Sequence, residues 1–257
     1  MREYFWTVQD NLNIGLITGN SLRHNALGSY LKKLGHEVLQ ISEVNNSNKT
    51  KHSSVIENYF QFVDTAEKEV FNASEWHQEV NEKILINKGE LNSIPSSISP
   101  LLKCEFIVVY GSSFIKGELY DLLSKKNTIN LHIGISPQYT GSACNFWAMF
   151  DDNLHLVGGT IQKLSKRLDE GRILKYCYPN ISEENFNPFL FSMEAVRETF
   201  KGIEDVLNDY KKYIVNSIPN DSNKLIRYSK MNDFNIDAVK KFEKKEFTFK
   251  NIEKIRP

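Results

Sequence analysis

Two short apolar segments with a helical pattern between them place the strongest constraint on the fold of this chain. Residues 12–18 form an apolar run that closes at a Gly-Asn pair, which is typical of a buried strand. Residues 21–33 carry apolar side chains on one side and end before Gly35, a helix stop signal. Residues 36–41 then form a second predicted strand. Strand, helix and strand in this order make a βαβ unit, which begins a parallel sheet.

The same kind of pattern continues along the chain. The strongest buried-strand candidate runs from Cys104 to Gly111. Further strands are predicted over residues 128–133, 156–164 and 225–228; helices over residues 65–87, 114–123, 145–150, 188–213 and 236–242; and an exposed polar loop over residues 44–56. The predicted fold class is therefore α/β: a Rossmann-like, mostly parallel sheet flanked by helices, with a small C-terminal appendage. Because the composition turns polar after Tyr213, we expect a catalytic domain over residues 1–213 and a small segment over residues 214–257.

Composition narrows the class of partner. The 257 residues are 40% hydrophobic and 25% charged, an ordinary globular balance. Lys plus Arg and Asp plus Glu each total 32, so the chain lacks the basic excess of most nucleic-acid-binding proteins, and a small molecule is the expected partner. Three widely spaced cysteines fit neither a disulfide framework nor a zinc site, so we expect no metal and a reducing, cytoplasmic location. No apolar run approaches the roughly 20 residues that span a membrane, so no membrane partner is expected.

Two polar residues stand at the carboxyl end of a predicted strand, where open parallel sheets bind their ligands. Asn130 and His132 are two residues apart, so strand alternation puts both side chains on one face. A carboxamide beside an imidazole offers a hydrogen-bond donor and a group that titrates near neutral pH. Acyl transfer to an amine needs both functions.

These residues belong to a longer pattern. The segment from Asn130 to Gly141 reads NLHIGISPQYTG, a strand follows at residues 159–162, and Asp169-Glu170-Gly171 follows that strand. This order resembles the signature of the folate-dependent formyltransferases: Asn-x-His, a loop with Pro and Gly, a strand and then Asp-x-Gly. The resemblance covers roughly residues 12–175. The loop after His132 departs from it, reading Ile-Gly-Ile-Ser-Pro where the family usually has Pro-Ser-Leu-Leu-Pro, which bears on the entrance of the folate pocket.

The resemblance implies the formyltransferase fold and 10-formyltetrahydrofolate as co-substrate, with no metal. It implies that a substrate amine attacks the formyl carbon and makes a tetrahedral oxyanion. Asn130 would donate to that oxygen, His132 would stabilise it or relay the amine proton, and Asp169 would orient His132 and raise its basicity. The resemblance also implies a folate pocket, for which the candidate residues are Val109, Tyr110, Gly111, Ser165 and Leu168.

Candidates for the acceptor substrate come from two loops. Arg23 and His24 lie at the start of the first predicted helix, where anions bind readily, although an ordinary solvated helix start fits them equally well. Gly134 and Tyr139, in the loop after His132, are further candidates for substrate contacts. No Gly-x-Gly-x-x-Gly follows the first strand, which disfavours a dinucleotide.

The acceptor amine is inferred by elimination within the resembling family. Methionyl-tRNA formyltransferases carry a sizeable β-rich domain after the catalytic one, whereas only about eighty residues follow Leu174 here. Glycinamide ribonucleotide formyltransferases lack such a tail. The remaining class, sugar N-formyltransferases acting on nucleotide-linked amino sugars, suits a core with a small appendage and points to O-antigen synthesis.

Other functions stay open at this stage: a methionyl-tRNA formyltransferase, a hydrolase that releases formate, or a non-catalytic nucleotide-binding relative. We also predict a homodimer formed through the C-terminal segment. Its basis is a group of apolar residues without an obvious place in the main core: Leu225, Ile226, Phe234 and Phe242.

Overall fold

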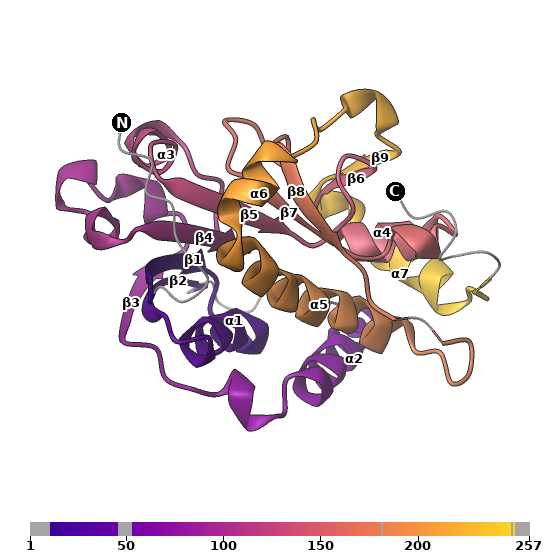
Figure 1. Cartoon of the computed structure of the whole chain (residues 1–257). Helices are drawn as coiled ribbons and strands as arrows, with labels where there is room; N and C mark the ends of the chain where they lie inside the picture. The colour runs from indigo at the N-terminus through magenta and orange to yellow at the C-terminus, as the bar shows by residue number, and fades with distance from the viewer. Residues whose placement is uncertain (1–10, 46–52, 181, 248, 250–257) are drawn as a thin grey trace.

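The computed structural model describes residues 11–45, 53–180, 182–247 and 249. At its centre is a 7-stranded sheet with the order β3-β2-β1-β4-β5-β7-β8 (Figure 1). The strands are β1 Asn13–Thr18, β2 Glu37–Val44, β3 Glu82–Asn87, β4 Phe106–Tyr110, β5 Asn127–His132, β7 Gly159–Lys163 and β8 Ile173–Cys177. Pairing is parallel from β3 to β5 and antiparallel from β5 through β7 to β8. The predicted α/β class with a mostly parallel sheet is confirmed.

Helices cover both faces of this sheet. They are α1 Leu22–Lys33, α2 Ser54–Val70, α3 Gly117–Leu123, α4 Cys144–Phe150, α5 Pro188–Asn208, α6 Tyr210–Val215 and α7 Ile236–Glu243. Short 3-10 helices are η1 Ser74–Trp76, η2 Leu91–Ser93, η3 Ser96–Ile98, η4 Pro100–Lys103, η5 Leu154–Leu156, η6 Ser222–Lys224 and η7 Met231–Asp233. A small parallel sheet joins β6 Tyr139–Gly141 to β9 Arg227–Ser229 beside α4 (Figure 1). Helices α1, α2 and α5 lie together on one side of the main sheet, as Figure 1 shows.

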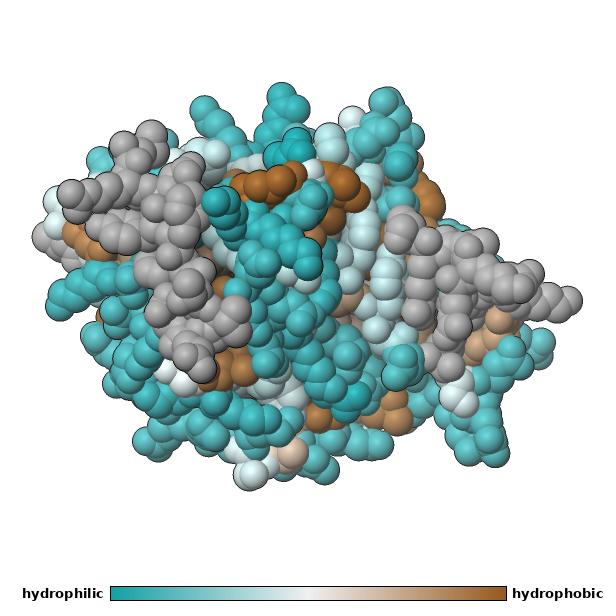
Figure 2. Space-filling model, viewed as in Figure 1, coloured by the Kyte–Doolittle hydropathy of each residue, from teal (hydrophilic) through white to brown (hydrophobic). Residues whose placement is uncertain are grey.

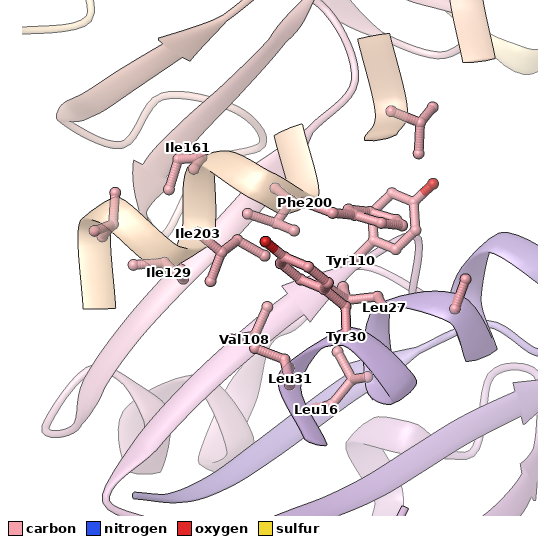
Figure 3. Packing of buried hydrophobic residues seen from close by; sticks show 14 of the residues in the cluster. Leu16, Leu27, Tyr30, Leu31, Val108, Tyr110, Ile129, Ile161, Phe200 and Ile203 are labelled. Atoms are coloured by element: carbon pink, nitrogen blue, oxygen red, sulfur yellow. The ribbon is translucent and has the colours of Figure 1, made fainter. Parts of the chain in front are cut away.

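Alternation along the strands separates two cores. In β4, Val108 and Tyr110 face α1 and α5, where Phe200 of α5 is fully buried (Figure 3). Ile107 and Val109 face the opposite side, toward α3. Because successive side chains of a strand point to opposite faces, a strand buried on both sides is apolar throughout, as β4 is. The site described below lies on the α3 side of β5.

The helix predicted over residues 65–87 is wrong. Helix α2 ends at Val70, and residues 82–87 form the edge strand β3, which pairs with β2. In β3, Ile84 and Ile86 are half-buried whereas Leu85 is 57% exposed. This is the period of two of an edge strand, and the apolar spacing across the whole stretch concealed it.

Other predicted boundaries moved. The strand over residues 156–164 shortens to β7 after the 3-10 helix η5, and the helix over residues 188–213 divides at Asp209 into α5 and α6. Strands β6 and β8 were not predicted. In the loop predicted over residues 44–56, residues 46–52 lie outside the described residues, and α2 already begins at Ser54. Across the described ranges, no helix combines the length and the apolar character needed to span a bilayer.

The C-terminal segment packs back onto the main body. Phe242 of α7 is 3% exposed, and Phe234 lies with its ring centroid 5.0 Å from Tyr59 of α2 and 4.9 Å from Phe146 of α4. The expectation that Phe234 and Phe242 lack a place in the core is therefore wrong: α7 is amphipathic, and its apolar side fills the gap between α2 and α4. Leu225 and Ile226 remain exposed, at 44% and 52%.

Replacement of Phe200 tests this packing. Phe200→Ala is expected to lower the free energy of unfolding by about 3–5 kcal/mol, because it leaves a cavity between the sheet and α5. Phe62→Ala, which removes a ring that is 57% exposed, is the matched control and should cost about 1 kcal/mol or less. Urea unfolding measures both values, and equal losses would contradict the core assignment.

Candidate functional site

The three residues predicted to be catalytic lie together. Asn130 and His132 leave β5 on the same face, and Asp169 reaches them from the turn after β7. The Asp169 carboxylate lies 3.5 Å from Nδ2 of Asn130 through Oδ1 and 3.3 Å from Nδ1 of His132 through Oδ2. Asp169 has a φ of +54°, a left-handed conformation that aspartate tolerates better than most residues.

His132 is held as an imidazolium. Its Nε2 lies 2.9 Å from the carbonyl oxygen of Tyr139, which can only accept, so Nε2 carries a proton. Its Nδ1 faces the Asp169 carboxylate, which also accepts. Burial opposes the charge, but the carboxylate and the nearby Cys144 thiol raise the pKa of His132 well above its ordinary value. The hydrogen-bond partners and the direction of this shift both favour the charged form of the buried ring.

Asp169 is correspondingly held as an anion. Burial favours its neutral form, yet the charge and hydrogen bond of His132, followed by the Gly141 N–H and the Asn130 amide, keep the pKa of Asp169 below its ordinary value. The Gly141 N–H donates to Oδ2 at 3.2 Å, and Nε2 of Gln162 donates to Oδ1 at 3.4 Å. Since β5 and β7 pair with Asn130 opposite Gln162, both amides reach the same oxygen.

Gly134 lies behind the His132 ring rather than in an open groove. A Cβ at this position would lie 2.5 Å from Cβ of Cys144 and 2.7 Å from Nε2 of His132, so only glycine fits. The Tyr139 hydroxyl points to the end of α4, where it donates to Asp151 at 3.2 Å and accepts from Asn153 at 2.7 Å. The contacts of both residues in the structure thus support the histidine, and their assignment to the substrate stays a prediction.

A cavity of about 270 Å³ opens beside the three residues. Asn130, His132 and Asp169 all contribute to its wall. So do all five residues predicted for the folate: Val109, Tyr110, Gly111, Ser165 and Leu168. The wall combines the loops after β4 and β7 with residues 130–133 at the end of β5, and it includes Val109 and Ile115 from the α3 side of the sheet.

Arg23 and His24 begin α1, as predicted, but Arg23 already has an anionic partner. The Glu67 carboxylate of α2 accepts the Arg23 backbone N–H at 2.5 Å and forms an ion pair with its guanidinium at 3.0 Å. Burial and the Arg23 charge lower the pKa of His24 to about 3. His24 Nδ1 accepts from the Ser21 N–H at 3.1 Å, so its proton lies on Nε2, beside Gly111 at the cavity.

Two residues near the site were not predicted. Gln162 contacts the carboxylate from β7, and Asn220, from the C-terminal segment, donates to the Asp169 carbonyl oxygen at 2.6 Å. Alternation along residues 159–162 could have identified Gln162 as a neighbour of Asn130, but only if the pairing of the two strands were known. Nothing in the sequence indicates a role for Asn220. Within the described ranges, no group of three or more His, Cys, Asp or Glu side chains could hold a metal ion.

No protein-family model matches the sequence, and no curated protein does. Solved structures match it. A sugar N-formyltransferase from Shewanella sp. superposes with a TM-score of 0.54 at 16% identity, covering 87% of this chain and 78% of that one. The phosphoribosylglycinamide formyltransferase of Anaplasma phagocytophilum gives 0.52 at 14% identity, with 77% and 86% covered.

A third match carries ligands. The N-formyltransferase of Helicobacter canadensis, solved with folinic acid and dTDP-3-aminofucose, gives a TM-score of 0.52 at 12% identity, covering 94% of this chain and 85% of that one. At such low identity these likenesses establish the fold. The chain therefore has the fold shared by sugar N-formyltransferases and phosphoribosylglycinamide formyltransferases, as the sequence predicted.

The charge state of His132 is open to direct measurement. In NMR titrations of the labelled imidazole, the wild-type ring should stay charged well above pH 6.5, about the ordinary midpoint. Asp169→Asn should move the pKa of His132 below that value, because burial then acts without the opposing carboxylate. Asp237→Asn, on the exposed side of α7, should leave the titration unchanged. An unaltered midpoint in Asp169→Asn would contradict the pairing.

Proposed function

We propose that this protein is a sugar N-formyltransferase, which moves the formyl group of 10-formyltetrahydrofolate to the amine of a nucleotide-linked amino sugar. The observation that carries the proposal is the group of Asn130, His132 and Asp169 beside one cavity, on a fold shared with such enzymes. We further propose that it works in the cytoplasm, in the synthesis of O-antigen sugars.

The cavity suits one end of a folate. Its volume of about 270 Å³ is below the range of roughly 300–1,000 Å³ typical for drug-sized ligands, so it would take the flat pterin and leave the remainder outside. Backbone groups of residues 110–113, 165 and 167–168 would meet the polar edge of the pterin, while Val109, Ile115 and Leu168 would contact its faces. The bound folate would supply the formyl group.

The charges of the trio suit acyl transfer. Negative charge develops on the formyl oxygen as the amine adds, and Asn130 would donate its amide N–H to that oxygen. The His132 imidazolium would stabilise the same charge from inside the protein, where a low dielectric strengthens the interaction. Because the ring already carries both protons, Asp169 is the member of the trio that would accept the proton of the amine. When the oxyanion collapses, the bond between the formyl carbon and N10 of the folate would break, and N10 would take up the proton, so that tetrahydrofolate leaves and the amine keeps the formyl group.

The start of α1 is the proposed contact with the nucleotide sugar. His24 keeps a neutral ring whose Nε2–H lies beside Gly111, at the edge of the cavity. Such a donor suits a sugar hydroxyl or a phosphate oxygen over a wide pH range. Arg23 would supply positive charge nearby, although Glu67 neutralises much of it. Gly134 and Tyr139 would act indirectly, by holding His132 in place.

We also propose a homodimer. Several apolar side chains of the C-terminal region are at least 44% exposed, namely Val215, Ile218, Leu225, Ile226, Tyr228 and Met231. Figure 2 shows apolar surface at the upper edge of the molecule, over the region where Figure 1 places α6. A second copy covering this surface would remove it from water, which is favourable.

The proposed reaction is tested with a panel of acceptors. The protein, 10-formyltetrahydrofolate and a set of nucleotide-linked amino sugars are incubated, and mass spectrometry detects the gain of one formyl group. Asn130→Ala should lower kcat by about 10²–10³-fold, the usual loss when one oxyanion donor is removed. Asp169→Ala and His132→Ala should be at least as damaging, whereas Asn223→Ala, at an exposed position outside the cavity wall, should retain transfer.

Other acceptors decide between the alternatives. Glycinamide ribonucleotide and charged initiator tRNA are included in the same panel, and formate is measured without any amine. Transfer only to the tRNA would assign the chain to the methionyl-tRNA formyltransferases. Formate release that needs no amine would indicate a hydrolase, and the absence of all turnover would favour a non-catalytic relative.

A separate variant tests the folate pocket. Leu168→Ala removes apolar surface from the cavity wall and should weaken tetrahydrofolate binding about three- to tenfold in titration calorimetry. Leu102→Ala is a matched control, since both leucines are 47% exposed and Leu102 lies on η4, away from the wall. Equal affinities of the two variants would place the folate elsewhere.

A further inference from the structure

We propose that the C-terminal segment over residues 216–229 is a positioning frame for the catalytic pair, and that Asn220 is the residue that holds Asp169 in its catalytic conformation. The inference rests on the proposed function for its catalytic meaning. Its structural basis is a set of contacts that reaches the His132–Asp169 pair from two sides.

The first side is the turn that carries Asp169. Nδ2 of Asn220 lies 2.6 Å from the Asp169 carbonyl oxygen, 3.4 Å from the Gly171 carbonyl oxygen and 3.5 Å from Oε1 of Gln162. All three acceptors belong to the strand and turn that deliver the carboxylate. Gln162 in turn donates to Oδ1 of Asp169, so the Asn220 amide supports both the backbone and the side chain of the acid.

These contacts matter because the turn is strained. Asp169 has a φ of +54°, a conformation that costs of order 1–3 kcal/mol for a non-glycine residue and persists only where its surroundings hold it. A side-chain amide donating to the carbonyl of the strained residue provides such a hold. Asn220 is itself anchored, because Ile218 bridges Ile173 of β8 through hydrogen bonds of 2.9 and 3.0 Å. Arg172 also donates to Ser217, with Nε 2.8 Å from Oγ.

The second side is the small sheet. The Ile226 and Arg227 N–H groups donate to the Gln138 carbonyl at 2.9 and 3.0 Å, and β9 then pairs with β6 along its length. Strand β6 provides the two backbone groups that meet the pair directly: the Tyr139 carbonyl, which accepts from His132, and the Gly141 N–H, which donates to Asp169.

The frame therefore holds both elements that contact the pair. Residues 217–220 hold the turn after β7, and residues 226–229 hold β6, while neither stretch contributes to the cavity wall. A segment that only covered apolar surface would not need to place polar groups on Asp169 and on the strand that touches His132. The appendage thus acts on the chemistry through position, without meeting the substrates itself.

The test removes the amide and measures the state of His132. Asn220→Ala deletes the donor together with most of the side chain, and Asn220→Leu replaces it with an apolar side chain of similar size that cannot donate. Asn223→Ala, on the exposed part of the same segment, is the matched control. The titratable groups facing His132 are Asp169 and the Cys144 thiol of α4. NMR titration of the His132 imidazole should show a lower pKa in both Asn220 variants, because a displaced carboxylate stabilises the imidazolium less.

Kinetics give the second readout. In the Asn220 variants kcat should fall about tenfold to a hundredfold, as expected for a misplaced catalytic group, while KM for both substrates stays within about twofold. The alkaline limb of the pH–rate profile should move to lower pH with the imidazole, and Asn223→Ala should match the wild type. An unchanged His132 titration and kcat, with only a lower melting temperature, would overturn the proposal.

The two proposals fail separately. If the wild type transfers no formyl group to any amino sugar, the proposed function falls. The His132 titration in the Asn220 variants still decides whether the segment positions the pair, since it requires no substrate.

Discussion

The structure depends on one buried ion pair, between His132 and Asp169. Burying two charges costs several kcal/mol per ion unless each remaining donor and acceptor is satisfied. Here both carboxylate oxygens have donors: Asn130 and Gln162 on one side, His132 and the Gly141 N–H on the other. The second nitrogen of the imidazole donates to a carbonyl of β6. Removing one partner would leave a charge unpaired in the interior, so the pair is stable only while the surrounding groups that hydrogen-bond to it are in place.

This requirement explains features that the parallel sheet alone would not have. Strand β7 runs antiparallel to β5, which sets Gln162 opposite Asn130 and brings the following turn back to the site. Glycine at position 134 lets α4 approach the imidazole from behind. Strand β9 pairs with β6, and the Glu67 carboxylate accepts the Arg23 N–H at the start of α1. Each of these contacts fixes a group next to the pair or next to the cavity.

Much of this arrangement could be predicted from the sequence, because short stretches of residues carry the patterns on which the prediction rests. Apolar runs predicted β1 and β4, and the period of two placed Asn130 and His132 on one face. The order of motifs related them to Asp169 across 36 intervening residues, since resemblance to a family carries information that periodicity lacks. The residues around the cavity came from the same resemblance, which placed the folate at the end of the strand before Gly111 and in the loop before Asp169.

What could not be predicted depends on tertiary pairing. Strand β3 was mistaken for helix because Ile84 continued an apolar spacing that runs from Val70, at the end of α2, through Trp76 and Val80. Gln162 faces the acid only because β7 is antiparallel, and Asn220 arrives from a segment 51 positions beyond Asp169. The partner of Arg23 lies 44 positions away, on a different helix. No local pattern encodes such contacts, so the charge balance at the start of α1 required the structure.

The central claim is that a buried imidazolium–carboxylate pair moves a formyl group to an amine. The most direct measurement follows a ¹³C-labelled formyl group from 10-formyltetrahydrofolate in a single turnover, over a range of pH, with the amino-sugar acceptor identified by the panel. The account predicts that the label appears on the amine and that the rate falls on the alkaline side with the midpoint at which His132 loses its charge. A label found only in free formate, or a rate whose pH dependence does not follow the ionisation of His132, would contradict it.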